Sequence, residues 1–201
     1  MSLTKSTIQT RSGIYLDLKN PRKEDVLLSD ISHALARVNR FNGHTKKAYS
    51  VAQHSILVSH ILWLNGEGDP KVLLAGLLHD AAEAYLGDVS SPLKRLIQGY
   101  EPLERRMMDI IIQALSPCLQ GLSEDKWGLV KKADRTILYI ESKYLMEKPF
   151  DGISDTFPFG NFCVVAADAE EAQEEFETRF LELLEDCMAE TSTPKEKWSC
   201  Y

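Results

Sequence analysis

The stretch LLAGLLHDAAEAYLGDVSSPLKR, residues 73–95, decides the fold class of this chain. Its first half carries leucine and alanine at helical spacing, and it follows Asp69-Pro70, where an aspartate caps a helix that begins with proline. The pattern predicts one helix from Pro70 that stops at Gly87. The pair His79-Asp80 lies inside this apolar helix and needs an explanation.

Burying a charged carboxylate among Leu, Ala and Gly costs several kcal/mol unless the group is paired or binds a metal. For an isolated pair, the plainer interpretation is a histidine near a helix end beside a solvated aspartate. Glu83 favours a different one, because at about 100° per residue it shares the helical face of His79 and Asp80. A face with these three side chains suits a cation and an activated water.

Two further residues extend the pattern. His54 lies in YSVAQHS (49–55), within a helix expected over about 50–64, and Asp134 lies in a helix expected over about 124–147 that Ser123 can cap. Taken alone, the first reads as an ordinary core or surface histidine and the second as a solvated aspartate. Together with His79-Asp80 they form the ordered set H…HD…D.

The remaining patterns are mostly helical. We expect an all-α, single-domain fold of six or seven helices around a central metal site, with minor short strands. The domain spans residues 1–201, with a core over 12–150, a C-terminal loop and helix over 151–188 and a frayed tail over 189–201. The other expected elements are helices over 30–39 (capped by Ser29), 101–115 and 168–188 (capped by Asp168), strands at 12–19 and 162–165, and polar loops at 40–47 and 148–161.

Composition bounds the class of protein. Hydrophobic residues make up 44% and charged residues 26%, as in soluble globular domains. The sequence has no apolar run of membrane-spanning length and no signal peptide at the start, so we expect no membrane partner and a cytoplasmic location. The four cysteines (Cys118, Cys163, Cys187 and Cys200) show no metal-ligand spacing and are expected to be free thiols. The net charge of −7 argues against a nucleic-acid polymer as partner, but a small phosphorylated substrate needs only a few local cations.

HDAAEAYLGDVSSPLKR (79–95), RFNGHT (40–45) and YSVAQHS (49–55) resemble the HD superfamily of metal-dependent phosphohydrolases. The likeness covers roughly residues 12–150 and extends to 5′-deoxynucleotidases, phage dATP triphosphohydrolases and the phosphohydrolase of oxetanocin biosynthesis. It implies a helical domain that hydrolyses phosphate from nucleotides. We expect purine nucleotides, with either ribose or deoxyribose, or analogues, such as dATP, dAMP or oxetanocin phosphates.

By position, the resemblance implies that His54, His79, Asp80 and Asp134 are metal ligands. Two imidazoles and two carboxylates suit Co²⁺, Mn²⁺, Fe²⁺, Ni²⁺ or Mg²⁺. None of the five histidines follows Asp80. HD proteins with two metals usually add histidine ligands there, so we expect one ion, and hydrolysis in preference to oxidation.

The resemblance also implies roles around the metal. Glu83 matches the general acid/base, and Asp88 matches an aspartate beside the sugar and reaction centre. Phe41 matches an aromatic residue on the sugar and base side, where the deoxynucleotidases carry Trp, although a place in the core would explain a Phe equally well. The expected phosphate-binding residues are Arg40 and, less directly, His44, Lys94 and Arg95.

Several alternatives stay open. The same ligands serve a triphosphate-releasing dNTP triphosphohydrolase, or a nucleotide-sensing HD module without turnover. A purely structural helical protein is the plainest alternative, and the burial of His79-Asp80 argues against it. Partners would be a small nucleotide substrate, a second copy of the chain and an enzyme of the same pathway. The apolar stripe that would serve a homodimer, which core packing explains equally well, is Leu103, Met107, Ile110, Ile111 and Ala114.

Overall fold

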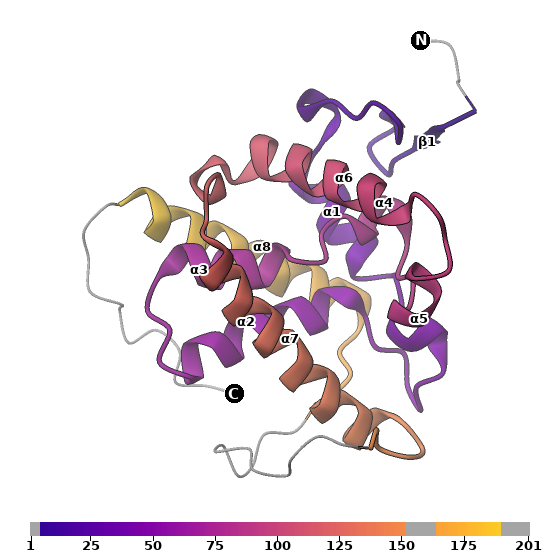
Figure 1. Ribbon diagram of the computed structural model, residues 1–201, viewed down its shortest axis with the longest axis vertical. Coiled ribbons are helices and arrows are strands. Elements are labelled where there is room, and N and C mark those ends of the chain that lie inside the picture. The colour runs from indigo at the N-terminus through magenta and orange to yellow at the C-terminus, as the bar shows by residue number, and fades with distance from the viewer. Residues whose placement is uncertain (1–4, 152–163, 190–201) are drawn as a thin grey trace.

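The computed structural model describes residues 5–151 and 164–189 (Figure 1). Within these ranges, six helices have eight or more residues: α1 (Leu28–Leu35), α2 (Val51–Leu64), α3 (Pro70–Leu78), α6 (Tyr100–Leu115), α7 (Glu124–Leu145) and α8 (Ala169–Met188). The short elements are α4 (Glu83–Leu86), α5 (Ser91–Lys94), the 3-10 turns η1 (Lys23–Asp25), η2 (Arg40–Gly43) and η3 (Pro117–Leu119), and the antiparallel strands β1 (Thr7–Gln9) and β2 (Tyr15–Asp17). The all-α prediction is confirmed.

Helix α2 lies at the centre of the fold and packs against α3, α7 and α8. It is apolar nearly all round, as a helix without a solvent face must be. Val51, Val58 and Ile61 are fully buried, and so is the polar His54. The element that carries one candidate ligand is therefore surrounded by protein on most sides.

Helix α3 approaches α2 closely at Gly76. A Cβ atom at this position would lie 2.6 Å from Leu62 Cδ1 and 3.4 Å from the Cα of Ser59. The missing side chain lets the two backbones approach, and three residues later the chain reaches His79. This contact places the end of α3 beside the N-terminal half of α2.

The capping residues on α7 and α8 follow the predictions. Ser123 Oγ accepts from the N–H of Lys126, and the Asp168 carboxylate accepts from the N–H of Glu171. Helix α2 begins with a full capping box, in which Ser50 Oγ accepts from the N–H of Gln53 and Gln53 accepts in return. The predicted bounds of these helices agree with the observed ones to within a few residues.

The prediction for α1 was wrong at both ends. The helix begins at Leu28, so Ser29 lies inside its first turn and no side chain caps it. It ends at Leu35 because the chain must turn to pair Asn39 with Ser50 in an isolated antiparallel bridge. This bridge brings the following loop to the start of α2.

The single helix expected from Pro70 to Gly87 was also wrong. Helix α3 ends at Leu78, and a turn precedes the one-turn helix α4. In this turn Ala81 N–H donates to the carbonyl of Leu78, and Glu83 N–H to the carbonyl of Asp80. These hydrogen bonds run to the carbonyl three residues earlier, whereas in a regular α-helix they run to the carbonyl four residues earlier. The chain is therefore wound more tightly here. His79 and Asp80 therefore lie at a break between helices.

The predicted strands and the apolar stripe on α6 agree with the structure only in part. Strand β2 occupies the middle of the predicted strand at 12–19, and its partner β1 was not predicted. The predicted strand at 162–165 begins outside the described residues, and Val164 and Val165 form no strand. Met107 and Ile111 of the stripe on α6 are fully buried in the core, whereas Leu103, Ile110 and Ala114 are half-buried. None of the helices formed by the described residues has both the length and the apolar character needed to cross a bilayer.

Candidate metal centre

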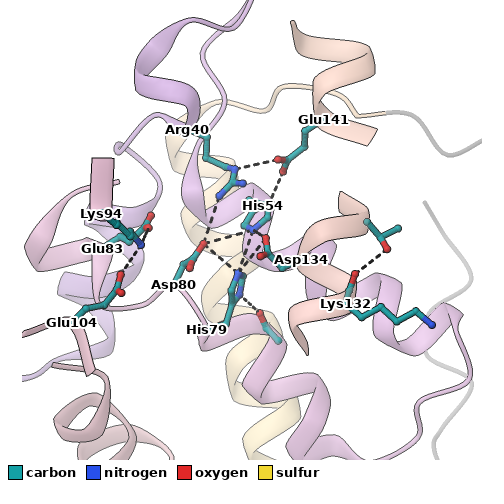
Figure 2. Close-up of polar contacts among 12 residues, drawn as sticks. Arg40, His54, His79, Asp80, Glu83, Lys94, Glu104, Lys132, Asp134 and Glu141 are labelled. Atoms are coloured by element: carbon teal, nitrogen blue, oxygen red, sulfur yellow. Dashed lines mark hydrogen bonds and ion pairs between the residues drawn. The ribbon is translucent and has the colours of Figure 1, made fainter. Parts of the chain in front are cut away.

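The four predicted ligands come together from three parts of the chain. His54 lies on α2, Asp134 on α7, and His79 and Asp80 in the turn after α3 (Figure 2). One ligand atom from each of His54, His79 and Asp80 lies within 4.8 Å of the others. These three residues form a candidate metal-binding triad.

Both imidazole rings present the same nitrogen to the cluster. His54 Nε2 and His79 Nε2 lie 3.3 Å apart, although the residues are separated by 25 positions. The opposite nitrogens face acceptors, since His79 Nδ1 lies 2.8 Å from the carbonyl oxygen of Gly76 and His54 Nδ1 lies 2.7 Å from Glu141 Oε1. These acceptors assign the ring protons to Nδ1, which leaves the Nε2 lone pairs for a cation.

Carboxylates complete the cluster. Asp80 Oδ2 lies 3.2 Å from His79 Nε2 and 3.7 Å from His54 Nε2. Asp134 Oδ1 lies 3.2 Å from His54 Nε2 and 3.9 Å from His79 Nε2. Asp134 therefore lies beside the triad, and its side chain is 37% exposed.

The electrostatics of the cluster favour a positive charge at its centre. Burial alone would lower the pKa of His79, but Asp80 and Asp134 raise it to about 9. Burial alone would raise the pKa of Asp80, but His79, His54 and Arg40 hold it well below the usual value. The pKa of Asp134 is lowered in the same way by the two histidines. A protonated imidazole supplies this positive charge in the metal-free chain, and a divalent cation would supply it more strongly.

Arg40 is buried beside the cluster. Its Nη1 lies 3.5 Å from Asp80 Oδ2, and its Nε donates to Glu141 Oε2 at 3.2 Å. These carboxylates raise the pKa of Arg40 further although burial opposes its charge. Glu141 was not predicted from the sequence. A signal existed, because Glu141 follows Asp134 by seven residues, two helical turns along the same face of α7.

Glu83 forms a second polar group with residues after the break (Figure 2). Lys94 Nζ lies 3.3 Å from Glu83 Oε1 and 2.6 Å from Glu104 Oε1. Glu83 is buried, and its Oε2 has no hydrogen-bond partner among the described residues. Burial, Asp80 and Asp88 raise the pKa of Glu83 to about 9, while Lys94 opposes the shift. The carboxyl is therefore protonated at neutral pH in the metal-free chain.

The remaining predicted residues lie at different depths. Asp88 is half-buried, and burial raises its pKa although Arg40 opposes the shift. Phe41 adopts a left-handed backbone with φ of 55° and packs its ring 6.1 Å from that of Phe150. His44 and Arg95 are exposed, and among the contacts of the described residues none joins them to the triad. Strained backbone at Phe41 is typical of functional loops.

Comparison with known proteins finds relatives but no activity. No family model matches the chain. YfdR of Escherichia coli (strain K12) is 33% identical over 147 residues, which cover 70% of this chain and 72% of YfdR. A protein of Rhodobacter capsulatus is 45% identical over 100 residues, which cover 48% of this chain and 51% of that protein. Both relatives are described as uncharacterized, so neither indicates a function for this chain.

Proposed function

The chain belongs to the same family as YfdR of Escherichia coli, and from the geometry of its site we propose that it is a metal-dependent phosphohydrolase of the HD superfamily. Its substrates would be nucleotides, with purine nucleotides or deoxynucleotides and their analogues as the first candidates. The ion would be held by His54, His79, Asp80 and Asp134.

The convergence of the two Nε2 atoms is the observation that carries this proposal. The two Nε2 atoms lie 3.3 Å apart and are flanked by carboxylates, so their lone pairs repel one another unless a proton or a cation lies between them. The donor set fits a divalent ion, because imidazole and carboxylate together suit Mn²⁺, Co²⁺, Fe²⁺ and Ni²⁺, and Mg²⁺ accepts the carboxylates. A bound divalent ion would supply Lewis-acid activation of a phosphoryl oxygen and of water.

Glu83 is the proposed general acid/base. It is the first residue of α4, three positions after Asp80, and its Oε2, which has no hydrogen-bond partner among the described residues, can hold a proton or release it. Its pKa of about 9 reflects first its burial and then the nearby negative charge of Asp80 and Asp88. Added positive charge at the cluster would bring that pKa toward neutrality, where proton transfer is most effective. Lys94 would hold the carboxyl in place through Oε1.

Arg40 is the proposed phosphate ligand. Its guanidinium faces Asp80 through Nη1, so one end points into the cluster while Glu141 holds the other. A planar guanidinium can form two parallel hydrogen bonds to a phosphate. His44, Lys94 and Arg95 would contribute weaker, more exposed positive charge, and Phe41 would border the sugar.

A nucleotide panel tests the proposal. The metal-free full chain is supplied with Mn²⁺, Co²⁺ or Mg²⁺ and incubated with dATP, dADP, dAMP and the ribonucleotides. Products are separated by HPLC. We expect metal-dependent release of phosphate or triphosphate that is lost in His79→Ala and Asp80→Ala. His60→Gln is the matched control, because it changes a histidine of α2 outside the triad.

The products decide among the alternatives. Inorganic triphosphate identifies a triphosphohydrolase, and single phosphates identify a phosphatase. Tight nucleotide binding without any product identifies a sensing module and contradicts the proposed reaction. Equal turnover by wild type and Asp80→Ala contradicts the proposed site.

A further inference from the structure

Glu141 is a buried carboxylate outside the proposed ligand set. It is fully buried on α7, and each of its oxygens serves a different donor. Oε1 accepts from His54 Nδ1 at 2.7 Å and Oε2 accepts from Arg40 Nε at 3.2 Å. Burying a charged carboxylate costs much free energy unless both of its oxygens accept hydrogen bonds. Both oxygens of Glu141 do so.

We propose that Glu141 is a positioning residue of the metal centre, which fixes the His54 ring with Nε2 toward the cluster and draws Arg40 away from Asp80. This inference rests on the proposed function, because it assumes that His54 and Asp80 hold a cation. Glu141 itself touches neither the cation nor the substrate.

Glu141 first determines which nitrogen of the His54 ring carries the proton. A neutral imidazole carries one proton, and Asp134 Oδ1, 3.2 Å from Nε2, attracts it toward the cluster. A ring protonated at Nε2 has no lone pair there for a metal. Glu141 lies closer to the opposite nitrogen, at 2.7 Å, and so favours the ligating tautomer.

Glu141 also balances the positive charge of Arg40 near the ligand Asp80. Arg40 stays protonated at every physiological pH, and its Nη1 lies 3.5 Å from Asp80 Oδ2. An unpaired guanidinium at that distance would compete with a cation for the ligand carboxylate. The negative charge of Glu141 balances the positive charge of Arg40. Arg40 therefore repels a cation at Asp80 less strongly.

His79 shows why Glu141 is the informative position. The corresponding contact of His79 goes to the backbone carbonyl of Gly76, which no substitution removes. Of the two contacts that orient the imidazoles, the one made by Glu141 can therefore be tested by mutation.

Glu141→Gln keeps the size of the side chain and removes its charge. A carboxamide has one acceptor oxygen and one NH₂ donor, so it can accept from His54 or from Arg40 but not from both. Asp30→Asn is the matched control: Asp30 is a buried carboxylate of α1 that accepts from Ser12 N and Oγ, outside the metal centre.

The experiment measures Mn²⁺ binding to the metal-free full chain by calorimetry, without nucleotide. Two-dimensional ¹H–¹⁵N spectra of the histidine rings report the tautomer of His54. For Glu141→Gln we expect affinity about 10- to 100-fold below wild type and an increased population of the Nε2–H tautomer. Asp30→Asn should bind as wild type does.

Glu141→Asp provides a second route if the glutamine variant does not fold. It keeps the charge near Arg40 but withdraws the acceptor from His54 by one methylene, so an intermediate loss is expected. Wild-type affinity and an unchanged tautomer in every folded variant at position 141 would overturn the inference while the metal site stands. Absence of Mn²⁺ binding by the wild-type chain would instead overturn the proposed function on which the inference rests.

Discussion

His79 Nδ1 donates to the backbone carbonyl of Gly76, three residues earlier, at 2.8 Å. In a regular helix this carbonyl would accept from the N–H of Asp80. The imidazole donates to this carbonyl instead, and four of the following N–H groups, those of Ala81, Glu83, Ala84 and Tyr85, donate to the third residue back. The hydrogen bond between His79 and Gly76 therefore lies at the end of α3. It also orients the His79 ring so that Nε2 points toward His54.

The close approach at Gly76 predicts a strong effect of side-chain size. In Gly76→Val the Cβ would lie 2.6 Å from Leu62 Cδ1 and 3.4 Å from the Cα of Ser59, and the two added methyl groups would crowd this contact between α3 and α2 further. We expect a loss of about 1 to 3 kcal/mol in the free energy of unfolding from overpacking. Mn²⁺ affinity should fall as well, because His79 moves with the end of α3.

Gly128→Val is the matched control for helix propensity. Gly128 lies on α7, and a Cβ atom added there would have no neighbouring atom within 4 Å among the described residues, so the same substitution meets open space. Urea unfolding and calorimetry should show wild-type stability and Mn²⁺ affinity for this variant. A Gly76→Val variant that matches it in both would contradict the role assigned to the close approach.

Metal addition should stabilise the chain. A ligand that binds only the folded state adds about 2.7 kcal/mol when present at 100 times its dissociation constant. We therefore expect Co²⁺ or Mn²⁺ to raise the Tm of EDTA-treated protein, and EDTA to reverse the shift. Scanning calorimetry measures both.

Asp134 sharpens this test, because it lies beside the triad without being part of it. If Asp134 binds the ion, Asp134→Asn should reduce the metal-induced rise in Tm strongly, whereas His60→Gln should leave it unchanged. A full rise in Asp134→Asn would restrict the protein ligands to His54, His79 and Asp80.

The metal-free chain should lose stability as the pH rises, in part through Glu83. Its pKa is about 9 in the folded state and near the ordinary value of 4.5 when unfolded. Between these values the folded state keeps a proton that the unfolded state has lost, so a rise in pH favours unfolding. His79, with a pKa raised to about 9, acts in the same direction above its ordinary value of 6.5.

Glu83→Gln removes the first of these contributions. Relative to wild type, the variant should gain stability as the pH rises from about 5 to 9 in the presence of EDTA. Exposed Glu101→Gln on α6 carries the same change of charge and should show no comparable trend. Urea unfolding at several pH values checks both, and parallel curves for Glu83→Gln and wild type would speak against a buried, protonated Glu83.

Local signals in the sequence predicted a large part of the fold. Apolar spacing indicated the helices, and Ser123 and Asp168 cap α7 and α8 as expected. The resemblance carried by the ordered set His54, His79-Asp80 and Asp134 also indicated that these side chains lie close together, as they do in the structure. A capping residue depends on its own turn, so it can be recognised without tertiary structure.

Contacts between distant elements could not be predicted in the same way. The break after Leu78 coincides with the hydrogen bond from the His79 side chain to the carbonyl of Gly76, and the apolar periodicity of the sequence continues across it. Glu141 lies on the expected face of α7, but its two donors come from α2 and from the loop after α1. The link between Lys94, Glu83 and Glu104 likewise joins α5, α4 and α6.

The cap of α2 links local structure to the site. Ser50 Oγ accepts from Gln53 N at 3.2 Å, and His54 follows within the first turn of the same helix. Ser50→Ala should lower the free energy of unfolding by about 1 kcal/mol. It should also weaken Mn²⁺ binding, because fraying of the first turn moves His54 away from Glu141 and His79.

Ser123→Ala separates these two effects. Ser123 caps α7, but Asp134 lies about three turns farther along that helix, beyond the reach of a frayed end. We expect a similar loss of stability with wild-type Mn²⁺ affinity. If both serine variants lose stability and neither loses affinity, the first turn of α2 is held by its burial against α3 and α8, and His54 does not depend on the cap.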